Sequence, residues 1–568
     1  MTQLTTIGVG RVVRSLLNPK LVIMLSTSSI SNQLHDRVAN ALRRGEALKA
    51  AYETTTLGQL VSMQARTHGP SIAIDIFERG ERATYSEMES KSNCYAHALR
   101  AFGVRKGDRV GVMLPNRIEF PLLWFALAKL GAVMVPLDMQ YTPREIEYII
   151  RETRAEFAVV DESAWPVFRA MDTWPQDLAK RRVILVGSPS NRTAITLHQL
   201  VKDVDDSPVH ENVRPEDLLT IQYTSGTTDV PKGCMLTHDY WGVCSYEFAY
   251  LNPYERYLSW ASSSYVYGPG ILLMSYRRGG TVYIAQKLDS SQFIHWLNKY
   301  SIEWCAFPRL IADSVNDVPK CLKQVSQYDG WSTATIRRFR EQFGVGAYYP
   351  WGMTETGSGT QMLPDLEEMN DAGSLGIRSP FRELRLVNDD GSPTPVGGVG
   401  ELWVKGRAIV KGYWNKPDAN TKYFEGEWFK TGDLLRRNEL GFYWFAGRKK
   451  DIIRRFSENI AACEVEAIIR ELPEIADVAA VPVSDKKWSE EVKIYVELKE
   501  GFTSADLPVE RILEHARARL AVFKVPRYIA FTPALPRTVA SKKVLKRELM
   551  AISDPLCDTY DGVEKRWR

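Results

Sequence analysis

The sequence predicts an α/β protein in which a large N-terminal domain of layered sheets precedes a small α+β lid, and three observations support this. The chain has 568 residues, more than one hydrophobic core usually organises. From about residue 52, helix-like and strand-like segments alternate, as in sheets covered by helices. Beyond residue 379 short strands and Gly/Pro turns take over, and a compact segment of roughly 120 residues, an ordinary domain size, ends the chain. We therefore expect an N-terminal extension (1–50), a main domain (51–447) and a lid (448–568).

Hydrophobic periodicity predicts the individual elements. Helices at 86–102 and 119–130 alternate with strands at 109–114 and 132–136, which is a βαβ rhythm. Further strands are predicted at 157–160, 182–186, 218–223, 281–285 and 304–307. A small antiparallel unit is predicted from strands at 383–387 and 400–405 and a turn at 389–391. The lid should contain helices at 463–470 and 509–520 and strands at 478–483 and 492–498.

The composition argues against several classes of protein. Hydrophobic residues make up 44% and charged residues 25% of the chain, as in ordinary globular proteins. A net charge of only +4 disfavours nucleic acid as a partner. The seven cysteines are scattered without a CxxC pair, which favours reduced thiols and a cytoplasmic protein. The apolar patch at 21–25 is too short for a transmembrane segment, so we interpret residues 1–50 as a mobile or surface-docked extension. Oligomeric state stays open, with a dimer among the alternatives.

A phosphate-binding loop is predicted at 223–233, directly after an apolar strand. Small hydroxyl residues and glycine allow N–H and O–H groups to converge on phosphate oxygens, and a lysine adds positive charge. The spacing between Gly226 and Lys232 differs from that of a Walker A loop. The candidate ATP-binding residues in this loop are Thr224, Ser225, Gly226, Thr227, Thr228 and Lys232.

With this loop, the sequence resembles the acyl-adenylate-forming superfamily (AMP-dependent synthetases and ligases), and most closely its acyl-CoA synthetase branch, which includes fatty-acid and carnitine CoA ligases. The resemblance runs from about residue 55 to 550, and four further blocks follow in the family's order. These blocks are WGMTE at 351–355, the segment 423–433 ending in TGD, GRKKD at 447–451 and LPRTVASKK at 535–543.

The resemblance implies a nucleotide site built from these blocks. Trp351, Gly352 and Met353 would line the nucleotide, Thr354 would contact the α-phosphate, and Glu355 would hold Mg²⁺, a hard cation that prefers oxygen ligands. In the later blocks, Asp433 would accept both ribose hydroxyls and Arg448 would also reach the nucleotide, which suits a carboxylate acceptor and a forked donor.

A hinge and a mobile lysine are implied by the last two blocks. Lys450 falls at the family's hinge position. Lys542 matches the lysine that enters the site to stabilise charge during adenylation, and Lys543 is the competing register. Rotation of the lid would then withdraw this lysine.

The acyl pocket and the thiol channel follow by the same resemblance. Tyr265, Tyr267 and Gly268 are expected to line the acyl pocket, where aromatic rings could hold an aryl or alkyl acid or cage a trimethylammonium group. The coenzyme A channel is expected at Phe456, Ser457 and Asn459. The sequence departs from the family at Asp229, Phe456 and Ser541, where small residues or glycine are usual.

The expected activity is therefore ATP-dependent activation of a carboxylic acid as an acyl-adenylate, followed by transfer to the thiol of coenzyme A. ATP, Mg²⁺ and coenzyme A are the implied cofactors. Two alternatives remain: an adenylation enzyme that loads a separate carrier protein, and a degenerate member that binds nucleotide without turnover. The sequence does not identify the acid.

Overall fold

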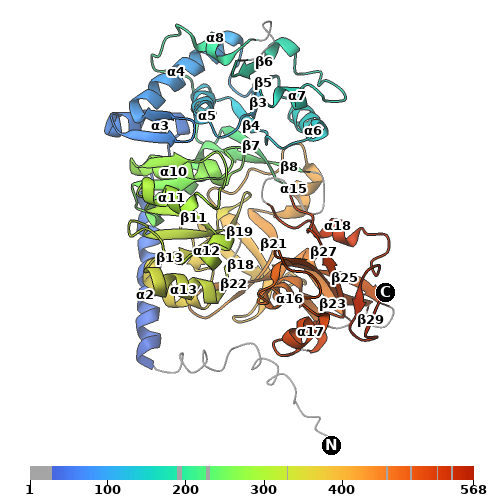
Figure 1. Ribbon diagram of the computed structural model, residues 1–568. Helices are drawn as coiled ribbons and strands as arrows, with labels where there is room; N and C mark the ends of the chain where they lie inside the picture. Colours follow the sequence, from blue (N-terminus) through green and yellow to red (C-terminus); the bar gives the residue numbers. More distant parts are fainter. Residues whose placement is uncertain are drawn as a thin grey trace, which may run out of the picture.

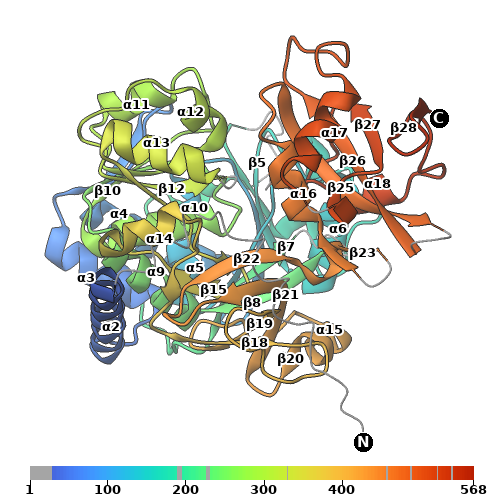
Figure 2. The ribbon, with the colours of Figure 1, turned by 90° about the horizontal axis from the view of Figure 1, so that it is seen from below.

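A computed structural model describes residues 28–188, 195–224, 231–328, 331–455, 458–485, 489–520, 522–538 and 542–568 of the chain. The main domain is built from two large sheets with helices around them and a smaller antiparallel sheet, and the lid lies beside these layers (Figures 1 and 2). This arrangement confirms the predicted fold class.

The first sheet has six strands in the order β6-β5-β3-β4-β7-β8. All neighbours are parallel except the hairpin β7–β8. The strands are β3 (Arg109–Met113), β4 (Val133–Pro136), β5 (Phe157–Asp161), β6 (Val183–Val186), β7 (Leu218–Thr224) and β8 (Lys232–Thr237). The associated helices are α3 (Leu57–His68), α4 (Tyr85–Phe102), α5 (Glu119–Leu130), α6 (Pro143–Thr153), α7 (Trp165–Phe168) and α8 (Leu197–Val201). Strands β3 to β6 are apolar apart from Arg109 and Asp161 at strand ends, because helices cover both faces of the sheet.

The second sheet has seven strands in the order β13-β12-β11-β9-β10-β1-β2, parallel except for β2. Its strands are β1 (Ile72–Ile76), β2 (Glu81–Thr84), β9 (Arg256–Ser259), β10 (Thr281–Ile284), β11 (Trp304–Pro308), β12 (Gln324–Tyr328) and β13 (Gly346–Tyr348). The neighbouring helices are α9 (His238–Leu251), α10 (Tyr267–Arg278), α11 (Phe293–Lys299), α12 (Arg309–Ser314), α13 (Thr333–Phe343) and α14 (Glu367–Asp371).

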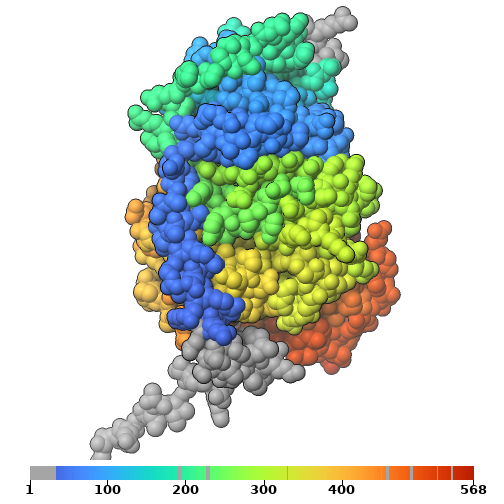
Figure 3. Space-filling view, turned by 90° about the vertical axis from the view of Figure 1, so that its left-hand side faces the viewer, coloured from blue at the N-terminus to red at the C-terminus, as the bar shows by residue number. Residues whose placement is uncertain are grey.

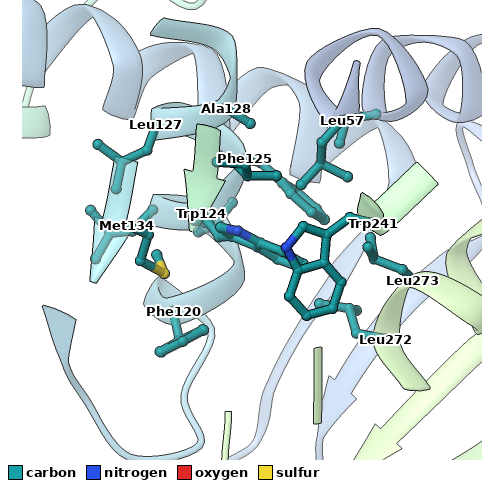
Figure 4. Packing of buried hydrophobic residues seen from close by; sticks show 14 of the residues in the cluster. Leu57, Phe120, Trp124, Phe125, Leu127, Ala128, Met134, Trp241, Leu272 and Leu273 are labelled. Carbon is teal, nitrogen blue, oxygen red and sulfur yellow. The ribbon is translucent and has the colours of Figure 1, made fainter. Parts of the chain in front are cut away.

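A shared core joins the two sheets. Trp124 of α5 and Trp241 of α9 pack edge to face with ring centroids 4.9 Å apart (Figure 4). Both indole N–H groups donate to the hydroxyl of Thr220 on β7, at 3.3 and 3.2 Å. The polar edges of these two buried rings are thereby satisfied, and β7 is fixed just before the predicted phosphate loop.

The antiparallel sheet lies on the C-terminal side of the main domain. Its strands are β18 (Arg382–Val387), β19 (Val399–Gly406), β20 (Phe424–Glu425), β21 (Trp428–Arg437) and β22 (Tyr443–Arg448), and α15 (Pro417–Tyr423) precedes β20. Four short strands form two small pairs nearby: β14 (Gly352–Met353), β15 (Gly357–Ser358), β16 (Thr360–Gln361) and β17 (Ile377–Arg378). The predicted antiparallel unit is confirmed.

The lid has its own core and a seven-stranded sheet. The strands are β23 (Ile452–Arg455), β24 (Glu458–Ala461), β25 (Ile475–Asp485), β26 (Ser489–Leu498), β27 (Tyr528–Thr532), β28 (Tyr560–Asp561) and β29 (Arg566–Trp567). The helices are α16 (Ala462–Ile469), α17 (Val509–Arg517) and α18 (Lys546–Met550). The chain leaves the antiparallel sheet after Arg448 and enters the lid sheet at Ile452. The four lid elements predicted from the sequence are present with shifts of a few residues.

The described part of the N-terminal extension is a long helix, α2 (Ser28–Ala50), that lies along the face of the main domain (Figure 3). Leu34, Val38 and Ala41 are buried in one cluster with Tyr348 of β13. Ion pairs from Arg44 to Asp365 (2.8 Å) and from Arg378 to Glu46 (2.9 Å) fix it further, so this helix corresponds to the surface-docked alternative.

Candidate active site

The predicted ribose carboxylate is held from two sides. Asp433 on β21 and Arg448 on β22 are direct register partners, and Arg448 Nε lies 3.2 Å from Asp433 Oδ1. The indole Nε1 of Trp351 donates to Asp433 Oδ2 at 2.9 Å. Because Asp433 is only 7% exposed, these two donors fix its carboxylate before any nucleotide binds. Blocks that are about 80 residues apart in the sequence therefore meet at one carboxylate.

The loop with Thr354 and Glu355 is held by buried donors. Tyr240 donates its hydroxyl to the carbonyl of Thr354 at 2.9 Å, and Tyr413 donates to Glu355 Oε1 at 2.8 Å. Behind the loop, Arg382 Nε donates to the carbonyl of Thr356 at 2.8 Å. Gly352 and Met353 form β14, which pairs with the strand that leaves the loop. These contacts hold the backbone so that Glu355 stays in a fixed place.

A buried ion pair supports this loop from below. Arg382 and Glu247 are at most 1% exposed, and their charged groups are 3.6 Å apart. Burial raises the pKa of Glu247, and the charge of Arg382 lowers it. Removing one partner would leave an uncompensated buried charge. The local sequence gave no sign of this pair.

The phosphate loop spans the turn between β7 and β8. Thr224 and Lys232 are register partners at its two ends, and Lys232 Nζ lies 6.0 Å from the ring of Tyr413 and 5.7 Å from that of Tyr423. Both distances fit a cation–π contact. The predicted residues Ser225, Gly226, Thr227 and Thr228, and the departure at Asp229, lie outside the described residues.

Cationic groups surround Glu355. Burial raises the pKa of its carboxyl, whereas the hydrogen bond from Tyr413 and the charges of Lys543 and Lys232 lower it. A buried carboxylate next to two ammonium groups fits a site for a triphosphate with a hard cation. Among the described residues no cluster of three or more His, Cys, Asp or Glu could hold a metal. Glu355 would therefore hold Mg²⁺ together with oxygens of the nucleotide, because this cation commonly binds through one carboxylate and phosphates.

Of the two candidate lysines in the last block, Lys543 is the one whose charge interacts with the site. Desolvation by the surrounding protein lowers the pKa of Lys543 and Arg448 adds repulsion, whereas Asp433 and Glu355 act in the opposite direction. Lys542 and Lys543 are both exposed; Lys542 has a left-handed backbone with φ of 54°, and its N–H donates to the carbonyl of Thr538. The assignment of the adenylation lysine to one of these two residues stays a prediction.

One of the predicted acyl-pocket tyrosines, Tyr265, interacts electrostatically with predicted nucleotide-binding residues. Burial raises the pKa of Tyr265, and the charges of Glu355 and Arg448 also act on it. Burial raises the pKa of Tyr267 to about 12, and Tyr267 interacts with Tyr265 and Tyr349. Gly268 is tightly packed, because an added Cβ would lie 2.5 Å from the carbonyl oxygen of Ser262. Trp260 and Tyr328 extend this aromatic wall, with ring centroids 4.8 Å apart.

The junction between main domain and lid is linked to the ribose site. Lys449 Nζ lies 3.2 Å from Glu401 Oε2, and the other oxygen of Glu401 accepts from the N–H of Gly432, the residue before Asp433. Lys450 lies in the 3₁₀ turn Lys449–Asp451, and Asn459 lies in β24; their side chains are outside the described residues, as are Phe456, Ser457 and Ser541.

Comparison with protein-family models gives two matches. Residues 61–414 match the AMP-binding enzyme model, and residues 464–542 match the model of the AMP-binding enzyme C-terminal domain. The chain belongs to the AMP-binding enzyme family. The first match covers most of the main domain and the second most of the lid, so both parts of this AMP-binding enzyme have counterparts in the family models.

Individual relatives agree with the family match. Over 487 residues, 82% of this chain and 92% of the relative, the chain is 30% identical to the crotonobetaine/carnitine–CoA ligase of Shigella dysenteriae. Two solved structures are also similar. An o-succinylbenzoate CoA synthetase from Bacillus subtilis with its acyl-adenylate intermediate is 25% identical, with a TM-score of 0.74 over 86% of this chain and 97% of that one. A fatty acyl CoA synthetase from Mycobacterium tuberculosis is 26% identical, with a TM-score of 0.67 over 87% and 97%.

Proposed function

We propose that this AMP-binding enzyme is an AMP-forming acyl-CoA ligase, which joins a carboxylic acid to the thiol of coenzyme A at the cost of ATP. The observation that carries the proposal is the convergence of Lys232, Glu355, Asp433, Arg448 and Lys543 on one site between the main domain and the lid. In a polar surface loop without a ligand, two lysines are not expected to lie close to a buried carboxylate and to Asp433, the predicted acceptor for the ribose hydroxyls. The relatives that act as CoA ligases support the same activity.

In the first half-reaction, an oxygen of the substrate carboxylate attacks the α-phosphorus of ATP, the bond to the bridging oxygen breaks, and pyrophosphate leaves. Asp433 accepts the ribose hydroxyls while Arg448 and Trp351 hold its carboxylate in place. Lys232 and Lys543 stabilise the negative charge that develops on the phosphates, and positioning with charge stabilisation supplies most of the catalysis. Mg²⁺, when held by Glu355, would neutralise part of the triphosphate charge.

We assign the lysine of this half-reaction to Lys543 in place of Lys542. The support is electrostatic, because Glu355 and Asp433 both act on the Lys543 ammonium. The lid is then in the orientation that suits adenylate formation. A hinge between Arg448 and Ile452, where the chain changes sheets, would let the lid carry this lysine away afterwards.

In the second half-reaction the thiol loses its proton to water, and its sulfur attacks the carbonyl carbon of the acyl-adenylate. The bond between that carbon and the phosphate oxygen breaks, and AMP leaves. Coenzyme A is the proposed acceptor; Asn459 and the neighbouring residues of the lid are proposed to border its channel. No described residue needs to act as a covalent nucleophile. The seven free cysteines favour a reducing compartment such as the cytoplasm.

The proposed acid has an apolar, aromatic or quaternary-ammonium tail. The wall beside the reacting groups is aromatic. Electrostatic interactions or ring contacts link its members, which are Trp260, Tyr265, Tyr267, Tyr328 and Tyr349. Aromatic faces bind flat or apolar groups by area and quaternary ammonium groups by cation–π attraction.

A substrate panel tests the function. Carboxylate-dependent exchange of pyrophosphate into ATP is measured with fatty, aryl and betaine acids, and thioester formation is then measured with free coenzyme A. Exchange with at least one acid and thioester formation from that acid are expected. If no acid supports exchange although the protein binds MgATP, the protein is a nucleotide-binding family member without turnover. If exchange occurs but no coenzyme A thioester forms, a carrier protein is favoured as the acceptor. Among the described helices, none is both long and apolar enough to cross a membrane.

A further inference from the structure

The segment 410–414 connects the two halves of the phosphate site, although none of the recognised blocks includes it. The N–H of Val410 donates to the carbonyl of Glu355 at 2.9 Å. The same segment pairs with β8: Met235 donates to Gly412 at 3.0 Å, and Trp414 donates to Gly233, next to Lys232, at 2.8 Å. The backbone between these contacts therefore spans from the metal-binding glutamate to the lysine of the phosphate loop.

Tyr413 lies at the centre of this segment, and its side chain contacts both groups. Its hydroxyl donates to Glu355 Oε1 at 2.8 Å, and the centroid of its ring is 6.0 Å from Lys232 Nζ. Tyr413 and Glu355 are 4% and 7% exposed, so their hydrogen bond is largely shielded from water.

Further contacts fix the orientation of Tyr413 itself. Its N–H donates to the side-chain oxygen of Asn420, and its carbonyl accepts from the amide of the same asparagine. Its ring packs against Tyr423 with centroids 5.8 Å apart. A tyrosine side chain has only two main torsions, and the backbone contacts with Asn420 and the ring contact with Tyr423 restrict them here. Tyr413 is thus a rigid spacer between a carboxylate and an ammonium.

We infer that Tyr413 is a positioning residue that sets the spacing of Lys232 and Glu355, so that one MgATP can engage both at once. The inference rests on the proposed function of this site as a metal–triphosphate site. The hydroxyl and the ring have separate tasks: the hydroxyl orients the metal-binding carboxylate, and the ring restricts the position of the lysine. A structural role alone would affect stability without separating metal binding from nucleotide binding.

The test compares three variants of the full-length protein. Tyr413→Phe removes only the hydroxyl, and Tyr413→Leu removes the ring as well. Tyr560→Phe is the matched control, because Tyr560 is a buried lid residue whose hydroxyl bonds to Glu510 at 3.1 Å. Mn²⁺ binding in the presence of ATP is titrated by electron paramagnetic resonance, and ATP binding in EDTA is titrated by calorimetry.

We expect Tyr413→Phe to weaken Mn²⁺ binding in the ATP complex about ten-fold or more, the size expected for a lost hydrogen bond to a charged group, and to leave metal-free ATP binding within about two-fold. Tyr413→Leu should weaken both, and Tyr560→Phe neither. The inference is overturned if folded Tyr413→Phe binds Mn²⁺ and ATP like the wild type, or if it weakens metal-free ATP binding as much as Mn²⁺ binding. If Tyr413→Leu does not fold, Tyr413→Phe decides the matter alone. A wild-type protein that binds Mn²⁺ with ATP but catalyses no pyrophosphate exchange would refute the ligase activity without touching this inference.

Discussion

Asp433 and Arg448 are register partners on the antiparallel strands β21 and β22, and their side chains form an ion pair of 3.2 Å. Residues directly opposite each other on two antiparallel strands have adjacent side chains, so the backbone pairing alone brings this carboxylate and this guanidinium together. The pairing also places Arg448, the partner of the ribose acceptor, four residues before Ile452, where the chain enters the lid sheet.

Replacing Asp433 by Asn should raise the KM for ATP about 10- to 100-fold, because a charged acceptor for the ribose hydroxyls becomes a neutral one and Arg448 loses its partner. Unfolding by urea should change little, since the substituted amide has the same shape. Initial rates of pyrophosphate exchange at varied ATP measure the effect. Glu425→Gln, which removes an exposed pair with Lys430 on the neighbouring strand, is the control. An unchanged KM for ATP in Asp433→Asn would contradict the ribose role.

Substitutions of the two neighbouring lysines should have different effects on the rate of adenylation. Lys543→Ala is expected to slow adenylation roughly 10²–10³-fold, the cost of losing one preorganised charge in an active site. Lys542→Ala should lie within about three-fold of wild type, because the ammonium that acts on Glu355 and Asp433 is that of Lys543. Thioester formation from synthetic acyl-adenylate should be spared in both variants. A larger adenylation defect in Lys542→Ala would restore the original register and refute our assignment.

The alkaline limb of the pH profile should move when Arg448 is changed. The pKa of Lys543 is lowered, so its ammonium form, present below that pKa, is lost at a lower pH than for an ordinary lysine, and adenylation should decline there. In Arg448→Gln the repulsion is gone and the pKa rises, so the decline should shift to higher pH. Adenylation rates at saturating ATP between pH 7 and 11 measure this.

Lys543→Arg serves as the matched control for that profile. A guanidinium stays charged over this range, so the alkaline decline should disappear or move to much higher pH even if the rate is lower. The same decline in Lys543→Arg and wild type would mean that another group titrates.

Replacing one member of the buried Arg382–Glu247 pair should lower the free energy of unfolding more than replacing both. Arg382→Met is expected to lower the free energy of unfolding by about 3–5 kcal/mol, because Glu247 is left buried without its partner. Arg382→Met with Glu247→Leu should recover part of this loss. Adenylation should stay low in both, since the carbonyl of Thr356 has lost its donor. Lys405→Met, at an exposed ion pair, is the control for urea unfolding. Full recovery of adenylation in the double variant would mean that Arg382 acts on stability only.

Much of the fold follows from local patterns. The βαβ segment from α4 to β4 was predictable because its strands are short apolar runs and its helices have clear starts, as at Thr84, whose hydroxyl caps α4 while Glu87 bonds back. The position of α2 on the main domain could not be predicted, because an amphipathic helix fits many surfaces. Only the residues that pack against it decide which surface it covers.

The sequence by itself determined the element types, the two-part layout and the five blocks that identify a nucleotide site, because these depend on residue type and spacing along the chain. Only the tertiary structure decided that Tyr413 and Arg382 support the same loop, and it is also the basis for our proposal that Lys543 is the adenylation lysine. The physical reason is that a charge acts through space over a few ångströms, and the residues that come this close belong to strands separated by tens to hundreds of positions.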